Sequence, residues 1–108
     1  MFSIKNNKIS ITRGDTAIIK VELLNHTWAE GDRMYFTVKK HSGNSDVLIQ
    51  KVLDEFPDGL ANIYLSQYDT DLPAGNYVYD LQCNLADGRI DTIIGPEEFK
   101  ILEGVTDE

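Results

Sequence analysis

The 108-residue sequence is poor in cysteine, in basic side chains and in long apolar stretches. Its single cysteine, Cys83, has no second cysteine with which to form an intrachain disulfide, and this favours synthesis in a reducing cytoplasm. No apolar run has the length of a membrane span, and the first eight residues are too polar for a secretory signal. We therefore expect a cytoplasmic product without a membrane partner.

The shortage of basic residues is uneven along the chain. Ten Lys and Arg stand against eighteen Asp and Glu, for a net charge of −8. Residues 1–51 hold eight basic and five acidic side chains (+3), and residues 52–108 hold two basic and thirteen acidic ones (−11). This balance argues against nucleic acid and anionic membranes, which bind clustered Lys and Arg. A solubilising acidic surface is the simpler interpretation, and head-to-tail contact between a basic and an acidic surface is the alternative.

Residues 69–85 carry the clearest structural pattern of the chain. Residues 69–75 combine Asp, Pro and Gly, which are turn formers. Residues 76–85 then alternate strictly, as in a half-buried strand, with Tyr77, Tyr79 and Cys83 on the apolar face. This strand is expected to be central. The Leu-Pro-x-Gly-x-Tyr entry resembles the tyrosine corner of immunoglobulin-like sandwiches, in which the phenol bonds back to the preceding corner.

Similar alternation, separated by turn residues, predicts the other strands. The expected strands are residues 8–12 (with 2–4 as a short companion), 16–24, 33–40, 47–53, 60–65, 76–85, and 90–94 resuming at 99–102 after a break at Gly95-Pro96. The strand 47–53 is less regular, because it has apolar residues on both faces. The pattern predicts one all-β domain over residues 1–102, an immunoglobulin-like β-sandwich of about seven antiparallel strands, with a small β-barrel as the alternative. Residues 103–108 are expected to form a flexible acidic tail.

No residue pattern points to catalysis, to a cofactor or to a firm metal site. His26 and His41 lack the spacing of zinc ligands, and Asp69 and Asp71 lack the full ligand set of a calcium loop, so turn capping is the simpler role for these aspartates. Cys83 has no nearby histidine and points inward. We expect a protein that is not an enzyme.

Two sets of apolar side chains are candidates for binding. Trp28, in a predicted loop, either plugs the end of the core or, with the loop residue Tyr68, contacts a carbohydrate or another ligand. Tyr35, Val78 and Ile93 project from the outer side of adjacent predicted strands, where they are either scattered surface residues or an interface with a partner or a second copy.

The order and spacing of several segments carry a family resemblance that spans residues 9–102. The segments are residues 11–16 (ITRGDT), 31–40 (GDRMYFTVKK), 69–80 (DTDLPAGNYVYD), 91–96 (DTIIGP) and 99–101 (FKI). In these segments the chain resembles a family of small immunoglobulin-like proteins encoded by phages and prophages of Gram-positive bacteria. It is also similar to the amino-terminal domain of phage baseplate upper proteins.

The resemblance implies a structural module of a tail, baseplate or virion, made in the bacterial cytoplasm and lacking catalysis. It implies that Gly14, Asp15 and Gly31 serve turns, and that the partners are copies of this chain or other phage structural proteins. Baseplate upper proteins continue into further domains, so we expect this chain to be a stand-alone accessory protein. A carbohydrate- or ligand-binding module is the alternative function.

Overall fold

Eight β-strands form two sheets in the computed structural model, which describes residues 2–23, 26–43 and 46–104. Predictions for residue 24, for the turn at 44–45 and for the tail at 105–108 fall outside these residues. The elements are β1 (Phe2–Lys5), β2 (Lys8–Thr12), β3 (Ala17–Glu22), β4 (Arg33–Lys39), β5 (Val47–Leu53), the short 3₁₀ turn η1 (Pro57–Gly59), β6 (Leu60–Leu65), β7 (Gly75–Asn84) and β8 (Ile90–Leu102). The all-β prediction is confirmed.

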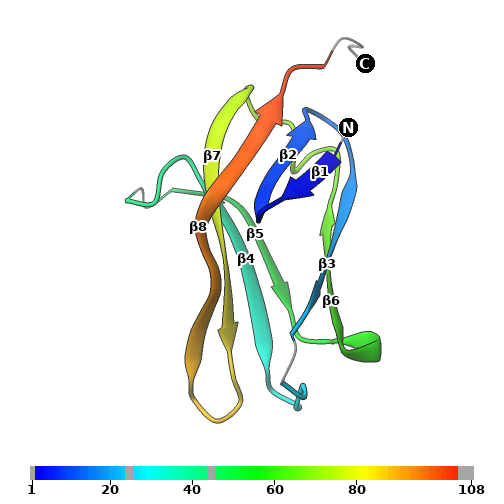
Figure 1. The fold of residues 1–108 in the computed structure, drawn as a ribbon, viewed down its shortest axis with the longest axis vertical. Coiled ribbons are helices and arrows are strands. Elements are labelled where there is room, and N and C mark those ends of the chain that lie inside the picture. The colour runs from blue at the N-terminus through cyan, green and yellow to red at the C-terminus, as the bar shows by residue number, and fades with distance from the viewer. Residues whose placement is uncertain (1, 24–25, 44–45, 105–108) are drawn as a thin grey trace.

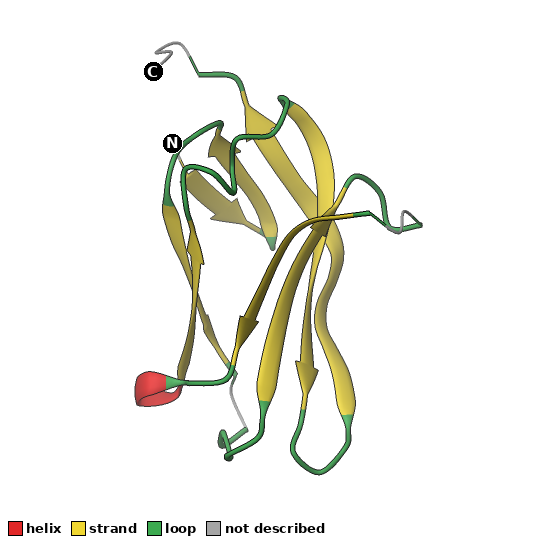
Figure 2. Ribbon diagram, turned by 180° about the vertical axis from the view of Figure 1, so that it is seen from behind, coloured by secondary structure: helices red, strands yellow, loops and turns green. Residues whose placement is uncertain are grey.

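The larger sheet has six strands in the order β1-β2-β8-β7-β4-β5, and β3 pairs with β6 in a separate two-stranded sheet (Figure 1). The ladders are antiparallel except for β2 and β8, which run parallel. The expected set of about seven antiparallel strands is therefore corrected to eight strands with one parallel pair. No strand pairing within the described ranges joins the two sheets into a closed barrel. Figure 2 shows the two-stranded sheet standing to one side of the larger one.

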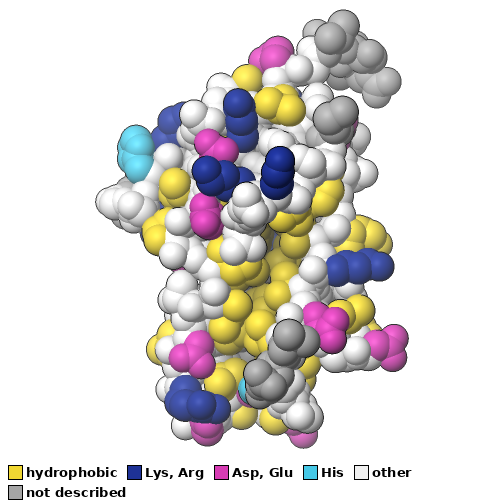
Figure 3. Space-filling model, in the orientation of Figure 1, with side chains coloured by type: hydrophobic (Ala, Val, Ile, Leu, Met, Phe, Trp, Pro, Cys, Tyr) yellow, Lys and Arg dark blue, Asp and Glu magenta, His cyan; other side chains and the backbone are white. Residues whose placement is uncertain are grey.

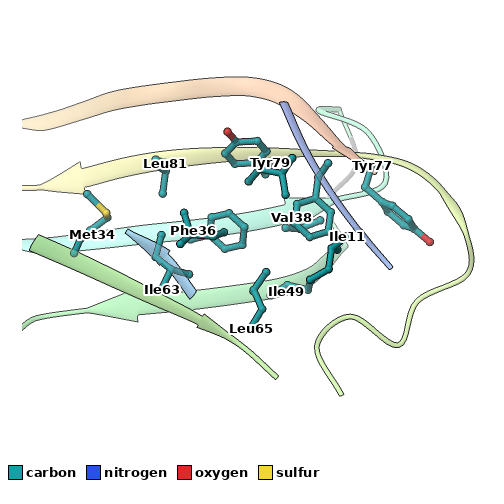
Figure 4. Close-up of a cluster of buried hydrophobic side chains, with 14 of the residues drawn as sticks. Ile11, Met34, Phe36, Val38, Ile49, Ile63, Leu65, Tyr77, Tyr79 and Leu81 are labelled. Atoms are coloured by element: carbon teal, nitrogen blue, oxygen red, sulfur yellow. The ribbon is translucent and has the colours of Figure 1, made fainter. Parts of the chain in front are cut away.

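The core lies between the two sheets and is built from the alternating residues of both. Met34, Phe36 and Val38 of β4 are almost fully buried, as are the predicted inward residues of β7. They meet Ile63 and Leu65 of β6 across the interior (Figure 4). Because side chains alternate between the two faces of a strand, burial of one set fixes the register of each strand.

The last strand differs from its prediction at Gly95-Pro96. The strand β8 continues through this dipeptide, and the register against β7 shifts on either side of Leu81. Glycine is required at position 95, because a Cβ there would lie 2.5 Å from the Cβ of Asp80. The dipeptide thus makes an irregularity in a continuous strand, and irregularities of this kind are among the places where proline is tolerated in a sheet.

A buried carboxylate ties two loops together at the lower end of the molecule in Figure 1. Asp32, just before β4, accepts hydrogen bonds from the backbone amides of Ala29 and Ala86, each at 2.8 Å, and lies 3.2 Å from Nε2 of His26. Ala86 belongs to the β7–β8 turn. The amide of Ala29, then that of Ala86, hold the pKa of Asp32 below its usual range, against the opposing effect of burial, and His26 adds to the lowering.

We expect Asp32→Asn to destabilise the fold by about 1–3 kcal/mol at neutral pH, because charged hydrogen-bond acceptors are replaced in a buried position. Because the pKa of Asp32 is lower in the folded chain than in the unfolded chain, this stabilisation is fully present at pH values above the unfolded pKa of about 3.9. It is lost as the pH falls through the pKa of the folded state. Melting curves from about pH 7 to pH 2 should therefore converge for the variant and the wild type at acid pH. Asp91→Asn, an exposed carboxylate at the same end, is the control. Equal melting of wild type and Asp32→Asn at pH 7 would contradict the role of this carboxylate.

Candidate interaction surfaces

The three residues predicted to share an outer-face patch lie on the larger sheet but do not form one apolar cluster. Tyr35 on β4 is opposite Gln82, whereas Val78 on β7 is opposite Lys39. Gln82 and Val78 are separated by four positions along β7, or roughly 13 Å at 3.3 Å per residue. Ile93 lies in β8 at the register shift beside Gln82. A polar residue thus stands between Tyr35 and Ile93, and Val78 lies well away from both.

Val78 lines a small polar cleft on this outer face. The cleft has a volume of about 90 Å³ and is lined by Thr37, Lys39, Ser42, Val78, Tyr79, Asp80 and Pro96. Charged and hydroxyl side chains make up much of its wall. This setting differs from the core of a typical protein interface, which is depleted in charge.

Trp28 closes the lower end of the core. Its ring stacks on Phe56 with centroids 3.6 Å apart and an angle of 3° between the planes, and its Nε1 donates a hydrogen bond to the carbonyl of Gly59 at 3.2 Å. His26 meets the indole edge-on. The residue is half-buried and packs against the core cluster. Trp28 therefore ties the β3–β4 loop to the β5–β6 connection, which accounts for both the apolar and the polar part of its side chain.

Tyr68 lies at the other end of the molecule and cannot share a binding site with Trp28. The carbonyl that binds Trp28 immediately precedes β6, and Tyr68 follows the far end of the same strand. Tyr68 is 80 % exposed in the β6–β7 connection. The structure thus separates the two residues that were considered together as ligand contacts.

The cysteine considered as a nucleophile and the aspartates considered as metal ligands are buried in the core or bonded to other residues of the protein. Cys83 is buried in β7, where burial, and then the charges of Asp91 and Asp32, raise its pKa to about 11, so the thiol is protonated at neutral pH. Asp69 accepts the amide of Ser66 at 2.7 Å, and Asp71 pairs with Arg13 at 2.9 Å. Among the residues that the structure describes, no three His, Cys, Asp or Glu side chains are grouped as metal ligands.

Two apolar features were not predicted from the sequence. The free edge strand β5 exposes Val47, Leu48 and Val52, and Val52 lies directly opposite Tyr35. On the outer face of the small sheet, Ile18 and Tyr64 form an exposed cross-strand pair. Apolar residues on both faces of residues 47–53 were the signal for the first feature.

A basic surface surrounds the β1–β2 hairpin. Lys5, Lys8 and Lys100 line a shallow cleft of about 360 Å³ together with Glu98 and neighbouring polar residues. Residues 2–13 contain three basic side chains and no acidic one. In Figure 3, Lys and Arg side chains gather over the upper part of the molecule. The hairpin is positioned by Tyr79, whose hydroxyl donates to the carbonyl of Asn7 in the turn.

The comparisons with known proteins find no match: no protein-family model, no curated protein and no solved structure is significantly similar to this chain. Within the described residues, no helix has the length and apolar character needed to cross a membrane. The surfaces described above are therefore the basis for inferring a function.

We expect Trp28→Ala to destabilise the fold by about 3 kcal/mol, because the substitution removes a stacked, half-buried indole and leaves a cavity at the end of the core. Tyr68→Ala, at an exposed aromatic, should change stability by less than about 0.5 kcal/mol. Chemical denaturation of both variants measures the difference. Equal stability of Trp28→Ala and wild type would contradict the structural role and would favour a binding role for the indole.

Proposed function

We propose that this chain is a non-enzymatic structural module that assembles by protein–protein contact, with copies of itself or with other proteins of a phage or prophage particle. The observation that carries the proposal is the open edge of the larger sheet at β5. This strand pairs on one side only, and exposes Val47, Leu48 and Val52. Unpaired strand backbone flanked by apolar side chains is a physical means of association.

An immunoglobulin-like arrangement is part of the proposal. It is supported by the two facing sheets and by the hydrogen bond that Tyr77 donates to the carbonyl of Pro73, four residues earlier. That bond has the pattern of a tyrosine corner, in which the phenol at the start of a strand bonds back to the preceding turn.

The assignment to a phage or prophage particle rests on the resemblance of the sequence segments. Two of the glycines expected to serve turns have positive φ angles, +81° at Gly14 and +95° at Gly31, which favour glycine. This agrees with a structural rather than a catalytic use of these segments. Synthesis in the bacterial cytoplasm followed by incorporation into a virion, as a tail, baseplate or accessory component, is the proposed course.

Ligand binding has less support from the positions of the side chains. One face of the Trp28 indole lies on Phe56, and its ring nitrogen is bonded to Gly59. This face of the indole and its ring nitrogen are therefore both engaged within the protein, and neither is directed to a ligand in this conformation. The described clefts on the larger sheet are partly open and present polar and apolar surface in about equal measure, whereas small-molecule sites are mostly apolar and enclose much of their ligand.

Mass spectrometry of purified particles tests the proposal. Particles from an induced prophage-bearing source strain should contain the chain in a fixed ratio to the coat or tail proteins. A strain that carries Val52→Lys should yield particles depleted of the chain, because a charge on the β5 edge opposes its contact. Tyr64→Lys, at an exposed aromatic on the outer face of the small sheet, is the matched control. Absence of the wild-type chain from well-formed particles would contradict incorporation in the virion.

A further inference from the structure

In the described part of the chain, the outermost strands of the larger sheet are β1 and β5, and both expose apolar side chains. A third open stretch is residues 90–98 of β8, which pair with β7 alone because β2 pairs only with Phe99–Leu102. Within residues 2–23, 26–43 and 46–104, β1 pairs only with β2, and β5 pairs only with β4. Nine large hydrophobic residues are exposed in the part of the chain that the structure describes, and four of them lie on these two strands: Ile4 (46 %), Val47 (47 %), Leu48 (41 %) and Val52 (50 %). Each edge is therefore suited to pairing with another strand.

The two edge strands run in the same direction. From β1 to β5, the sheet has an antiparallel, a parallel and then three antiparallel ladders. Four reversals leave the two outermost strands parallel. If the sheet of one copy continues into the sheet of the next, with the same face toward the core, β5 of the first copy lies parallel to β1 of the second.

Opposite charges stand at the matching ends of these strands. The strand β1 ends at Lys5, and Lys8 follows across the two-residue turn. The strand β5 is followed by Asp54 and Glu55. All four side chains are exposed. Parallel pairing of β5 with β1 therefore places the two carboxylates near Lys5 at the end of β1, with Lys8 on the next strand, β2.

The same charges oppose the symmetric β5 contact and do not favour the symmetric β1 contact. Antiparallel pairing of β5 with a second β5 brings the Asp54 end of one strand toward the exposed Asp46 at the other end of its partner. Antiparallel pairing of β1 with a second β1 places the two Lys5 residues at opposite ends of the pair, where β1 offers them no carboxylate. Like charges directly across a strand pair are destabilising, and such repulsion selects among alternative contacts.

We propose that copies of this chain associate head to tail, with β1 of one copy added in parallel to β5 of the next. This inference rests on the proposed assembly function and names its partner as a second copy. The contact is heterologous, so successive copies form a ring or an open filament according to the rotation between them. Lys51 in the middle of β5 does not repel the incoming lysines strongly, because its Nζ pairs with Asp69 of the same chain at 2.8 Å.

The charges also determine how the contact is tested. A net charge of −8 repels copies at long range. Salt weakens this repulsion as well as the local attraction, so salt dependence does not identify the contact. Exchange of the charged residues between the two strands does identify the contact. The variants are Lys5→Glu with Lys8→Glu, Asp54→Lys with Glu55→Lys, and the chain that carries all four changes.

Sedimentation equilibrium should show concentration-dependent association of the wild type. Each double variant should associate at least about tenfold more weakly, because the contact then holds like charges. The variant that carries all four substitutions, and a 1:1 mixture of the two double variants, should have association constants within about threefold of the wild-type value. The control with Lys20→Glu and Glu22→Lys, which exchanges charges on β3 outside both edges, should associate as the wild type does.

Several outcomes overturn the inference. Stronger association of the variant Asp54→Lys with Glu55→Lys would indicate the symmetric β5 contact. Unchanged association of both double variants would place the contact elsewhere. A wild type that stays monomeric at the highest soluble concentration would exclude self-association, whereas the proposed function would still stand if the chain were found in particles, with another protein as its partner.

Discussion

The packing of β4 and β7 against the two-stranded sheet is the contact on which the rest of the structure depends. Alternating side chains of β4 and β7 fill the space above β3 and β6, and nearly all of them are buried. Burial of this kind contributes about 25 cal/mol for each Å² of apolar surface, so these strands supply much of the stability. The surrounding loops close the ends of this core, with Trp28 at one end and the Tyr77 corner at the other.

The same arrangement leaves strand edges unpaired. Among the described residues, both strands of the small sheet, as well as β1, β5 and residues 90–98 of β8, have a strand neighbour on one side only. Proteins commonly protect such edges with charges, short strands or irregularities. Here β1 is only four residues long and the irregularity of β8 lies at Gly95-Pro96, but β5 is seven residues long and carries exposed aliphatic side chains. That contrast makes β5 the principal surface for assembly in this account.

Much of the fold could be predicted from local patterns, because alternation depends only on neighbouring residues. The inward set from Tyr77 to Cys83 and the turn at Asp87-Gly88 are examples. The partners of each strand could not be predicted in this way. The parallel pairing of β2 with β8 joins segments about ninety residues apart. Likewise, the cross-strand neighbours on the outer face depend on register, so the sequence could not show that Tyr35 and Val78 lie at different positions along the sheet.

Other features depended on contacts between distant segments. The sequence left Trp28 with two roles, and only its stacking on Phe56 and its bond to Gly59 distinguish a plug of the core from an exposed anchor. The edge position of β5 was equally hidden. Its apolar residues on both faces are compatible with a fully buried strand, and only the strand order shows that one side is open.

Hydrogen–deuterium exchange of the backbone amides, measured over a range of protein concentrations, tests the central claim most directly. If β5 is the strand that binds a neighbouring copy, its outward amides should exchange more slowly as concentration rises, together with those of β1. The amides of β3 and β6, which also lie on open edges, should show no such change and serve as an internal reference. Protection that grows on β3 and β6 while β1 and β5 stay constant would contradict the account and assign assembly to the small sheet.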